Sequence, residues 1–131
     1  MIFSTLIALA VATQELDPDC TDPDFAPQGC PNAELVRAEA ALDRQWEWNV
    51  ADMKARDGRL DRSHDDRPGY VDTLQAAQAA WRTYRDQHCA SEGYEARGAA
   101  AEPVLIISCK TKLTRQRTEE LQALAGESRA K

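Results

Sequence analysis

The four cysteines carry the clearest covalent chemistry in this chain. They stand at Cys20, Cys30, Cys89 and Cys109, and an even number of cysteines in a small exported chain favours two disulfides. Four cysteines allow three pairings. We expect Cys20–Cys30 and Cys89–Cys109, because each pair brackets one local loop, and the sequence leaves the other pairings open. Closing a loop of about 20 residues stabilises a fold by roughly 3 kcal/mol.

A metal site is the other chemistry that cysteines support. Zinc ligands usually come as close pairs such as C-x-x-C, and the sequence holds no such pair. His88 adjoins Cys89, but neighbouring side chains on a helix point in different directions. The run His64-Asp65-Asp66 is typical of a solvated, charged loop. We therefore expect no metal and no cofactor.

The sequence offers equally little evidence of a catalytic site. A nucleophilic site needs a serine or cysteine, a histidine base and an orienting carboxylate. The two histidines are His64, in a charged loop, and His88, beside a cysteine expected to be oxidised. With 22 acidic residues, some pair of carboxylates always resembles a glycosidase site, so that signal carries no information. We expect a binding protein and not an enzyme.

The N-terminal residues have the pattern of an export signal. Residues 2–12 are apolar apart from Ser4 and Thr5 and end in Ala10-Val11-Ala12, which resembles a signal-peptidase site. The run is far shorter than the roughly 20 residues that span a bilayer. We expect a signal peptide and a periplasmic or secreted protein. The predicted segments are a signal peptide at 1–12, an irregular Pro/Asp-rich arm at 13–30, a helical domain at 31–125 and a polar tail at 126–131.

Apolar residues at spacings of three and four predict three helices. The first starts at Pro31-Asn32, ends near Arg56 and buries a stripe of Leu35, Ala38, Leu42, Trp46, Asn49 and Met53. After a charged, mobile connector at 57–69, the second starts near Asp72 with Gln75 at capping-box spacing. Its stripe is Leu74, Ala77, Trp81, Tyr84 and His88. The third has Pro103 in its first turn, ends at Gly126 and buries Ile106, Cys109, Leu113, Arg117, Leu121 and Leu124.

These segments predict the fold class. The chain has 131 residues, the size of one domain, and it shows no strand-like alternation. We expect an all-α protein: a small antiparallel three-helix bundle with an irregular N-terminal arm, stapled by disulfides. The apolar stripes are narrow, so the disulfides should supply a substantial part of the stability.

The charge balance restricts the partners. The formal net charge is −6, which argues against nucleic acid and against an anionic membrane surface. A cationic partner is electrostatically favoured, chiefly through faster encounter.

One block of sequence is specific enough to indicate a family. Residues 77–89 read AQAAWRTYRDQHC and resemble the hallmark helix of the LprI-like lysozyme inhibitor family, A-Q-x-x-W-x-x-[YF]-R-D-x-x-C. The resemblance continues through Gly93-Tyr94, Glu102-Pro103, Cys109 and the run LTRQRTEEL at 113–121. It covers about residues 30–122. Three features depart from the family pattern: Ala99-Ala100 stands where relatives carry Gly-Ser, no cysteine lies inside the first helix, and the lipoprotein signal of the namesake is missing.

The resemblance implies an envelope protein that binds and blocks a lysozyme. Animal lysozymes are basic and this chain is acidic, so their encounter would be steered. We expect contacts from an exposed loop, either 57–69 or 93–102, through Asp65, Asp66, Tyr94 and Glu95. The alternative is a structural or accessory periplasmic module that binds another envelope protein, or a small ligand in a groove lined by Trp46, Trp81 and Tyr84.

The family-motif residues are expected to be structural. They are Gln78, Trp81, Tyr84, Arg85, Asp86, Cys89, Cys109, Leu113, Arg117 and Leu121. We place Trp81 and Tyr84 in the core, and expect the adjacent Arg85 and Asp86 to bond neighbouring helices and not each other. Arg115 and Arg117 should offset Glu119 and Glu120 along an exposed face. Trp46 and Trp48 lie about 200° apart around a helix, so only one of them can point inward.

Overall fold

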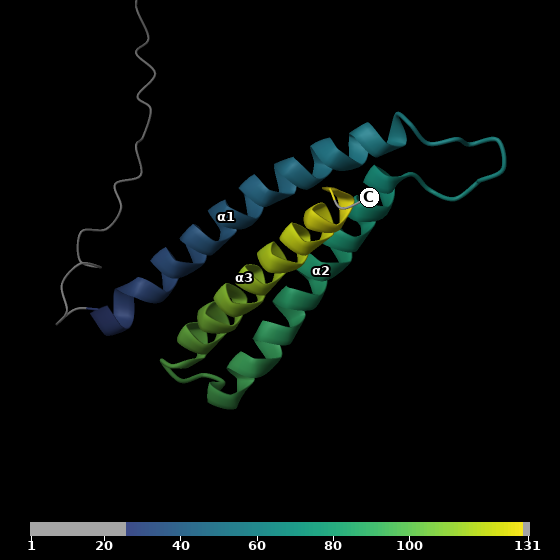
Figure 1. Ribbon diagram of the computed structural model, residues 1–131. Helices are drawn as coiled ribbons and strands as arrows, with labels where there is room; N and C mark the ends of the chain where they lie inside the picture. The colour runs from purple at the N-terminus through teal and green to yellow at the C-terminus, as the bar shows by residue number, and fades with distance from the viewer. Residues whose placement is uncertain (1–25, 130–131) are drawn as a thin grey trace, which may run out of the picture.

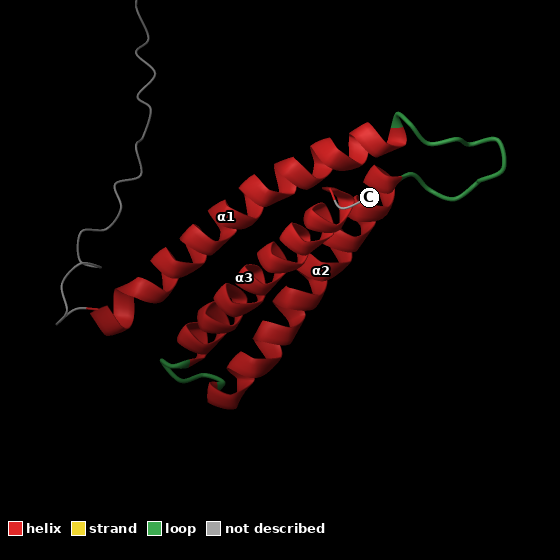
Figure 2. Ribbon diagram, viewed as in Figure 1, coloured by secondary structure: helices red, strands yellow, loops and turns green. Residues whose placement is uncertain are grey.

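A computed structural model describes residues 26–129 as three long helices. They are α1 (Ala26–Asp57), α2 (Tyr70–Gly93) and α3 (Glu102–Arg129), with a short 3-10 helix, η2 (Tyr94–Ala96), after α2. Consecutive helices run in opposite directions, and α3 lies against both α1 and α2 (Figure 1). Residues 26–129 contain no strand (Figure 2). The predicted all-α antiparallel three-helix bundle is therefore confirmed. None of these helices is long and apolar enough to cross a membrane.

The core is a thin apolar seam where the three helices meet. Leu42 and Met53 of α1, Leu74 of α2 and Leu121 of α3 form its buried centre. Partly buried neighbours pack around it: Trp46, Val50, Val71, Trp81 and Leu124. The stripes predicted for α1 and α3 therefore face the core, as the spacing of their apolar residues indicates.

A buried asparagine joins α1 to α3 through the seam. Asn49 is fully buried, and its Nδ2 donates a 2.9 Å hydrogen bond to the carbonyl of Leu121. Gln45 Nε2 donates to Asn49 Oδ1 at 2.8 Å. Because both ends of the amide are satisfied, the polar side chain is tolerated in the core and fixes the relative position of the two helices.

Two predicted helix ends are wrong, because both helices are longer than predicted. The first helix begins at Ala26 and not at Pro31, so residues 26–30 of the predicted arm are helical. Pro27 then lies in the first turn, where a missing backbone N–H needs no partner. The third helix continues past Gly126 to Arg129. Gly126 does not adopt the positive φ of a helix-ending glycine cap.

The start of α2 is determined by a residue that lies outside the helix. The helix begins at Tyr70, close to the predicted start near Asp72, but its N-cap residue is Gly69, so the predicted capping role of Asp72 is wrong. The carboxylate of Asp57, the last residue of α1, accepts hydrogen bonds from the backbone N–H groups of Tyr70 at 2.7 Å and Val71 at 3.0 Å. A side chain on Gly69 would meet this carboxylate, since a Cβ there would lie 2.7 Å from Asp57 Oδ1. Asp57 thus caps α2 across the whole intervening loop.

The second helix buries a different stripe from the one predicted. Leu74, Gln78 and Cys89 are its buried residues up to the last turn. Tyr84 is 55% exposed, so its predicted place in the core is wrong. The polar Gln78 takes a core position instead, where its Oε1 accepts a 3.0 Å hydrogen bond from Arg117 Nε. Trp46 packs on the core while Trp48 is 69% exposed, as their spacing predicts.

Candidate protein-binding surface

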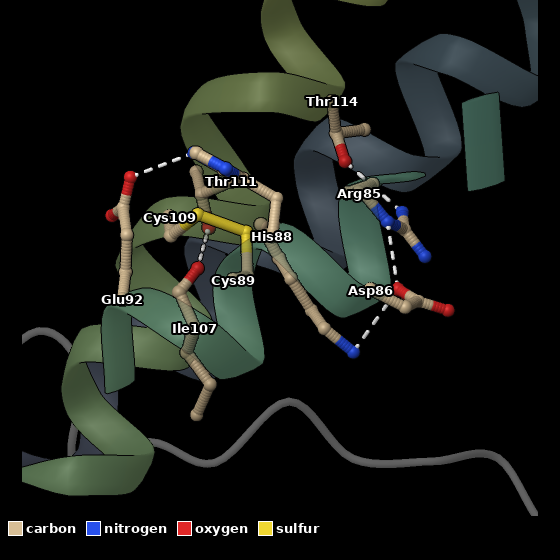
Figure 3. Close-up of a disulfide and its surroundings, with 10 residues drawn as sticks. Arg85, Asp86, His88, Cys89, Glu92, Ile107, Cys109, Thr111 and Thr114 are labelled. Atoms are coloured by element: carbon tan, nitrogen blue, oxygen red, sulfur yellow. Dashed lines mark hydrogen bonds and ion pairs between the residues drawn. A yellow bond between two sulfur atoms is a disulfide. The ribbon is translucent and has the colours of Figure 1, made fainter. Parts of the chain in front are cut away.

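The end of the bundle where α2 turns into α3 is locked by a disulfide. Cys89 on α2 and Cys109 on α3 form the predicted bond, with a Cα–Cα distance of 5.4 Å, and both are buried. Figure 3 shows the bond running between the two helices. Cys20, and the side chain of Cys30, lie outside the described residues, so the Cys20–Cys30 pairing stays a prediction. We call the part of the molecule formed by residues 84–105 the disulfide corner.

Close backbone packing further fixes the disulfide corner. A Cβ on Gly93 would lie 2.4 Å from Cγ1 of Ile106, so only glycine lets α2 and α3 approach this closely. Gly98 has a φ of 80°, a conformation that favours glycine. Its N–H donates a 2.7 Å hydrogen bond to Glu102 Oε2 at the start of α3. Glu102 and Pro103 thus open α3 where the sequence predicts, and the connection between the helices has little freedom.

The outer surface of the disulfide corner carries an aromatic stack and a histidine–carboxylate contact. The rings of Tyr84 and His88 stack with centroids 5.2 Å apart. His88 Nε2 lies 2.9 Å from Glu92 Oε1, one turn further along α2. Beside them is a shallow hollow of about 380 Å³ lined by His88, Ser91, Glu92, Glu95 and Leu105. The hollow therefore combines carboxylates with aromatic and aliphatic walls.

Exposed apolar side chains gather at this end of the bundle. Of the seven large hydrophobic side chains exposed among the described residues, four lie in the disulfide corner: Tyr84, Tyr94, Val104 and Leu105. The Arg97 guanidinium covers part of the Tyr94 ring at 4.6 Å from its centroid. Residues 84–105 contain four acidic residues and two arginines, a formal charge of −2. Clustered aromatic and apolar exposure with a polar rim is typical of a protein-binding surface.

The four predicted contact residues do not form one surface. Tyr94 and Glu95 lie in η2, in the disulfide corner, and both are exposed. Asp65 and Asp66 lie in the loop at the other end of α2 (Figure 1). The 24 residues of α2 separate the two ends by roughly 36 Å.

The aspartates of that loop also differ from each other. Asp65 forms a bidentate pair with Arg67 at 2.8 Å for each contact, and these hydrogen bonds hold the pKa of the Asp65 carboxyl far below its usual range. Asp66 is exposed. Asp65 is therefore already neutralised within the protein, whereas Asp66 is open to solvent.

The family-motif residues form the framework behind the disulfide corner. Two guanidiniums lie over the ring of Trp81, those of Arg85 and Arg117, at 5.1 Å and 6.0 Å from the ring centroid. Arg85 Nη1 contacts Glu39 of α1 at 3.2 Å and donates to Thr114 of α3 at 3.1 Å. These contacts connect all three helices.

Two predictions about ion pairs are wrong: Arg85 and Asp86 were expected not to pair with each other, and Arg115 was expected to offset acidic residues of its own helix. Arg85 Nε does contact the adjacent Asp86, at 3.1 Å, because the long guanidinium folds back along the helix. Arg115 pairs with Glu34 of α1 and not with the acidic residues of its own helix. The predicted pair between Arg117 and Glu120 is present at 2.9 Å.

Asp86 adds a second bridge between α2 and α3. Lys110 Nζ lies 3.2 Å from Asp86 Oδ1, the oxygen that Arg85 also contacts (Figure 3). Partial burial acts to raise the pKa of Asp86, but the hydrogen bonds from Lys110 and Arg85 outweigh it and hold the pKa below its usual range. Arg85 and Asp86 therefore do bond neighbouring helices, as predicted.

A possible metal-ligand cluster lies on the same surface. The ligand atoms of His88, Glu92 and Cys109 all lie within 4.8 Å of one another. The Cys109 sulfur is bonded to Cys89, however, and a zinc-binding cysteine must be a thiolate. In the oxidised protein the cluster is left with two ligands. The i,i+4 spacing of His88 and Glu92 was the sequence signal that could have placed both on one surface.

Comparison with known proteins gives two matches. A family model described as lysozyme inhibitor LprI matches residues 20–121. The chain is also 36% identical over 113 residues to an uncharacterized protein of Rhizobium meliloti (strain 1021), covering 85% of this chain and 81% of the relative. No solved structure matches the chain.

Proposed function

The chain belongs to the lysozyme inhibitor LprI family, and from this premise we propose that it is an exported binding protein that inhibits lysozyme through its disulfide corner. The single observation that carries the proposal is the gathering of exposed aromatic and carboxylate side chains on a disulfide-locked connection. The predicted signal peptide at residues 1–12 supports a periplasmic or secreted location.

The chemistry of the disulfide corner fits a basic partner. Tyr94 and Leu105 are exposed anchors, and aromatic side chains contribute strongly to interface energies. Glu92 and Glu95 border the hollow next to Leu105 and can meet cationic side chains at the rim of a lysozyme cleft. The surface is already ordered by the disulfide, Gly93 and the Glu102 cap, so binding costs little conformational entropy. In this proposal the protein blocks the cleft and performs no reaction itself.

A matched pair of charge reversals tests the location. E95K and D66K make the same change in net charge at opposite ends of the bundle, and both residues are exposed. Inhibition of a basic animal lysozyme is measured by cell-wall lysis, with binding followed by calorimetry. E95K, and separately Y94A, should weaken binding about tenfold or more, the loss expected for an interface anchor. D66K should leave the dissociation constant nearly unchanged at moderate salt.

Three outcomes are informative. Selective loss in E95K and Y94A supports the disulfide corner as the binding surface. Equal losses in E95K and D66K would show that only the overall charge matters and would overturn the assignment of the surface. If the wild-type protein fails to inhibit any lysozyme, the function itself is wrong.

A further inference from the structure

We propose that the disulfide corner contains a latent zinc site, formed by His88, Glu92 and Cys109, which opens when the Cys89–Cys109 disulfide is reduced. The disulfide and the metal compete for the same sulfur atom, so the protein holds either one or the other. We keep the expectation of no metal, drawn from the sequence, for the oxidised protein alone. The zinc site does not depend on lysozyme binding.

The three ligands come together from two helices. His88 and Glu92 are four residues apart on α2, so their side chains project from the same side of the helix. Cys109 belongs to α3, and the three ligand atoms lie within 4.8 Å of one another. Figure 3 shows these side chains grouped beside the disulfide. Ligand atoms around one tetrahedral zinc ion lie about 3.3–3.6 Å apart, a spacing that small side-chain rotations can reach from this arrangement.

His88 is already oriented for metal binding. Its ring stacks on Tyr84 with an interplanar angle of 18°, and its Nε2 lies 2.9 Å from Glu92 Oε1. A zinc ion would replace this direct contact by binding both atoms. The side chains of His88 and Glu92 also line the hollow of about 380 Å³ on the surface, so an ion can reach these two ligands from solvent.

The donor set selects a transition metal of the zinc class. An imidazole nitrogen, a carboxylate oxygen and a thiolate sulfur are all ligands that zinc accepts. Calcium and magnesium prefer oxygen ligands alone, so a site that contains a thiolate does not suit them. Three protein ligands leave one coordination position, which water or the thiolate of Cys89 can fill.

The site opens by thiol–disulfide exchange. A dithiol reductant supplies two electrons and two protons, the S–S bond breaks, and Cys89 and Cys109 become thiols while the reductant becomes a disulfide. The Cys109 thiol then releases its proton to solvent as its sulfur binds zinc. Oxidation of the two cysteines by a disulfide oxidant reverses the exchange and expels the ion.

Two single variants remove the disulfide by substitution and form a matched pair. C89S leaves the Cys109 thiol in the proposed site, whereas C109S removes this ligand and leaves the thiol of Cys89. Both variants lack the disulfide and retain Cys20 and Cys30, so these shared features cancel in the comparison. Zinc chloride binding is measured by calorimetry with a non-thiol reductant present. Cobalt chloride serves as the spectroscopic probe, because cobalt bound to a thiolate gives a charge-transfer absorption.

We expect C89S to bind zinc at least about tenfold more tightly than C109S, since the loss of even an outer-shell partner typically costs about 10–100-fold in metal affinity. The cobalt–thiolate absorption should appear in C89S. Adding E92Q to C89S should weaken zinc binding by a similar factor. Glu95 lines the same hollow but lies outside the ligand cluster, so adding E95Q should change the affinity less than about twofold.

Three results would overturn the proposal. They are equal zinc affinities of C89S and C109S, zinc binding by the oxidised wild-type protein as tight as that of C89S, or equal effects of E92Q and E95Q. Circular dichroism verifies that each variant is folded.

Reoxidation of the wild-type protein gives a second test that needs no variant. After reduction by a dithiol, zinc should slow the return of the Cys89–Cys109 disulfide, because the metal holds the Cys109 sulfur. Calcium should leave the rate unchanged. The disulfide is followed by mass spectrometry of the digested protein. Equal rates of reoxidation with and without zinc would contradict the competition between metal and disulfide.

Discussion

At the scale of single residues, the position of a side chain in this fold can depend on a hydrogen bond to a residue far away in the sequence. Gln78 occupies a buried position because Arg117 donates to it across the helix interface. A prediction from the spacing of apolar residues omits a polar residue at such a position and assigns Tyr84 to the core instead. The packing of Trp81 against the core was predictable, because Trp81 is apolar and has the sequence spacing of the buried residues. The partner that makes Gln78 acceptable lies 39 residues away, so no local signal could reveal it.

The Asp57 cap leads to a prediction on pH and stability. Hydrogen bonds from the backbone N–H groups of Val71 and Tyr70 hold the pKa of Asp57 below its usual range in the folded state. A carboxyl whose folded pKa is depressed stabilises the fold above its unfolded pKa, and this contribution is lost as the pH falls through the folded pKa. D57A should therefore lower the melting temperature at neutral pH, and the difference from wild type should disappear in acid.

The control for Asp57 is Asp66, which is exposed in the following loop. D66A should melt like the wild-type protein at neutral pH, as measured by circular dichroism. If D57A and D66A melt at the same temperature, or if the deficit of D57A persists unchanged in acid, the capping role is wrong.

Replacing either of two glycines by alanine should change the stability of the fold, in opposite directions. At Gly93 the new Cβ would lie 2.4 Å from Ile106 Cγ1, and overpacking of this kind costs about 1–3 kcal/mol. At Gly126 a Cβ meets nothing within 4 Å, and alanine in a helix interior gains about 0.5–1 kcal/mol over glycine. Urea unfolding should therefore show G93A destabilised and G126A stabilised. A stable G93A would mean that the contact between α2 and α3 is looser than described.

At the scale of helices, apolar periodicity predicted the number, order and approximate extent of the three elements. It did not predict where they end, because ends depend on backbone partners. Pro31 and Gly126 are common boundary residues, yet α1 begins at Ala26 and α3 continues to Arg129. The start of α2 depends on Asp57, 13 residues before Tyr70, which is beyond the reach of a local capping rule.

The disulfide should contribute a large share of the stability of the α2–α3 pair. Cys89 and Cys109 are separated by 20 residues, and closing a loop of that length typically contributes 2–4 kcal/mol, or about 3 kcal/mol in the chain-entropy model. The double variant C89A/C109A should lower the free energy of unfolding by about that amount in urea. The three helix-connecting contacts of Arg85 with Glu39 and Thr114 and of Asp86 with Lys110 should keep it folded. An unchanged unfolding midpoint would contradict this assignment.

At the scale of the whole molecule, the bundle presents two ends of different chemistry. The disulfide corner has a formal charge of −2 with exposed aromatic side chains, whereas the loop at the other end of α2 holds an exposed Asp66 and an Asp65 that is paired with Arg67. The sequence indicated both loops as candidate contact regions but could not show that they lie at opposite ends. Because α2 separates the two loops, we do not expect one lysozyme cleft to contact both Asp66 and Glu95.

The most direct test of lysozyme inhibition is a titration of the oxidised protein, from residue 13 onward, into a basic animal lysozyme during cell-wall lysis. The titration is run at low and at moderate salt. We predict stoichiometric inhibition that weakens only in part as salt rises, because the overall charge assists encounter while the aromatic contacts hold the complex. Lysis that continues unchanged at a clear molar excess of the protein would contradict the proposed function.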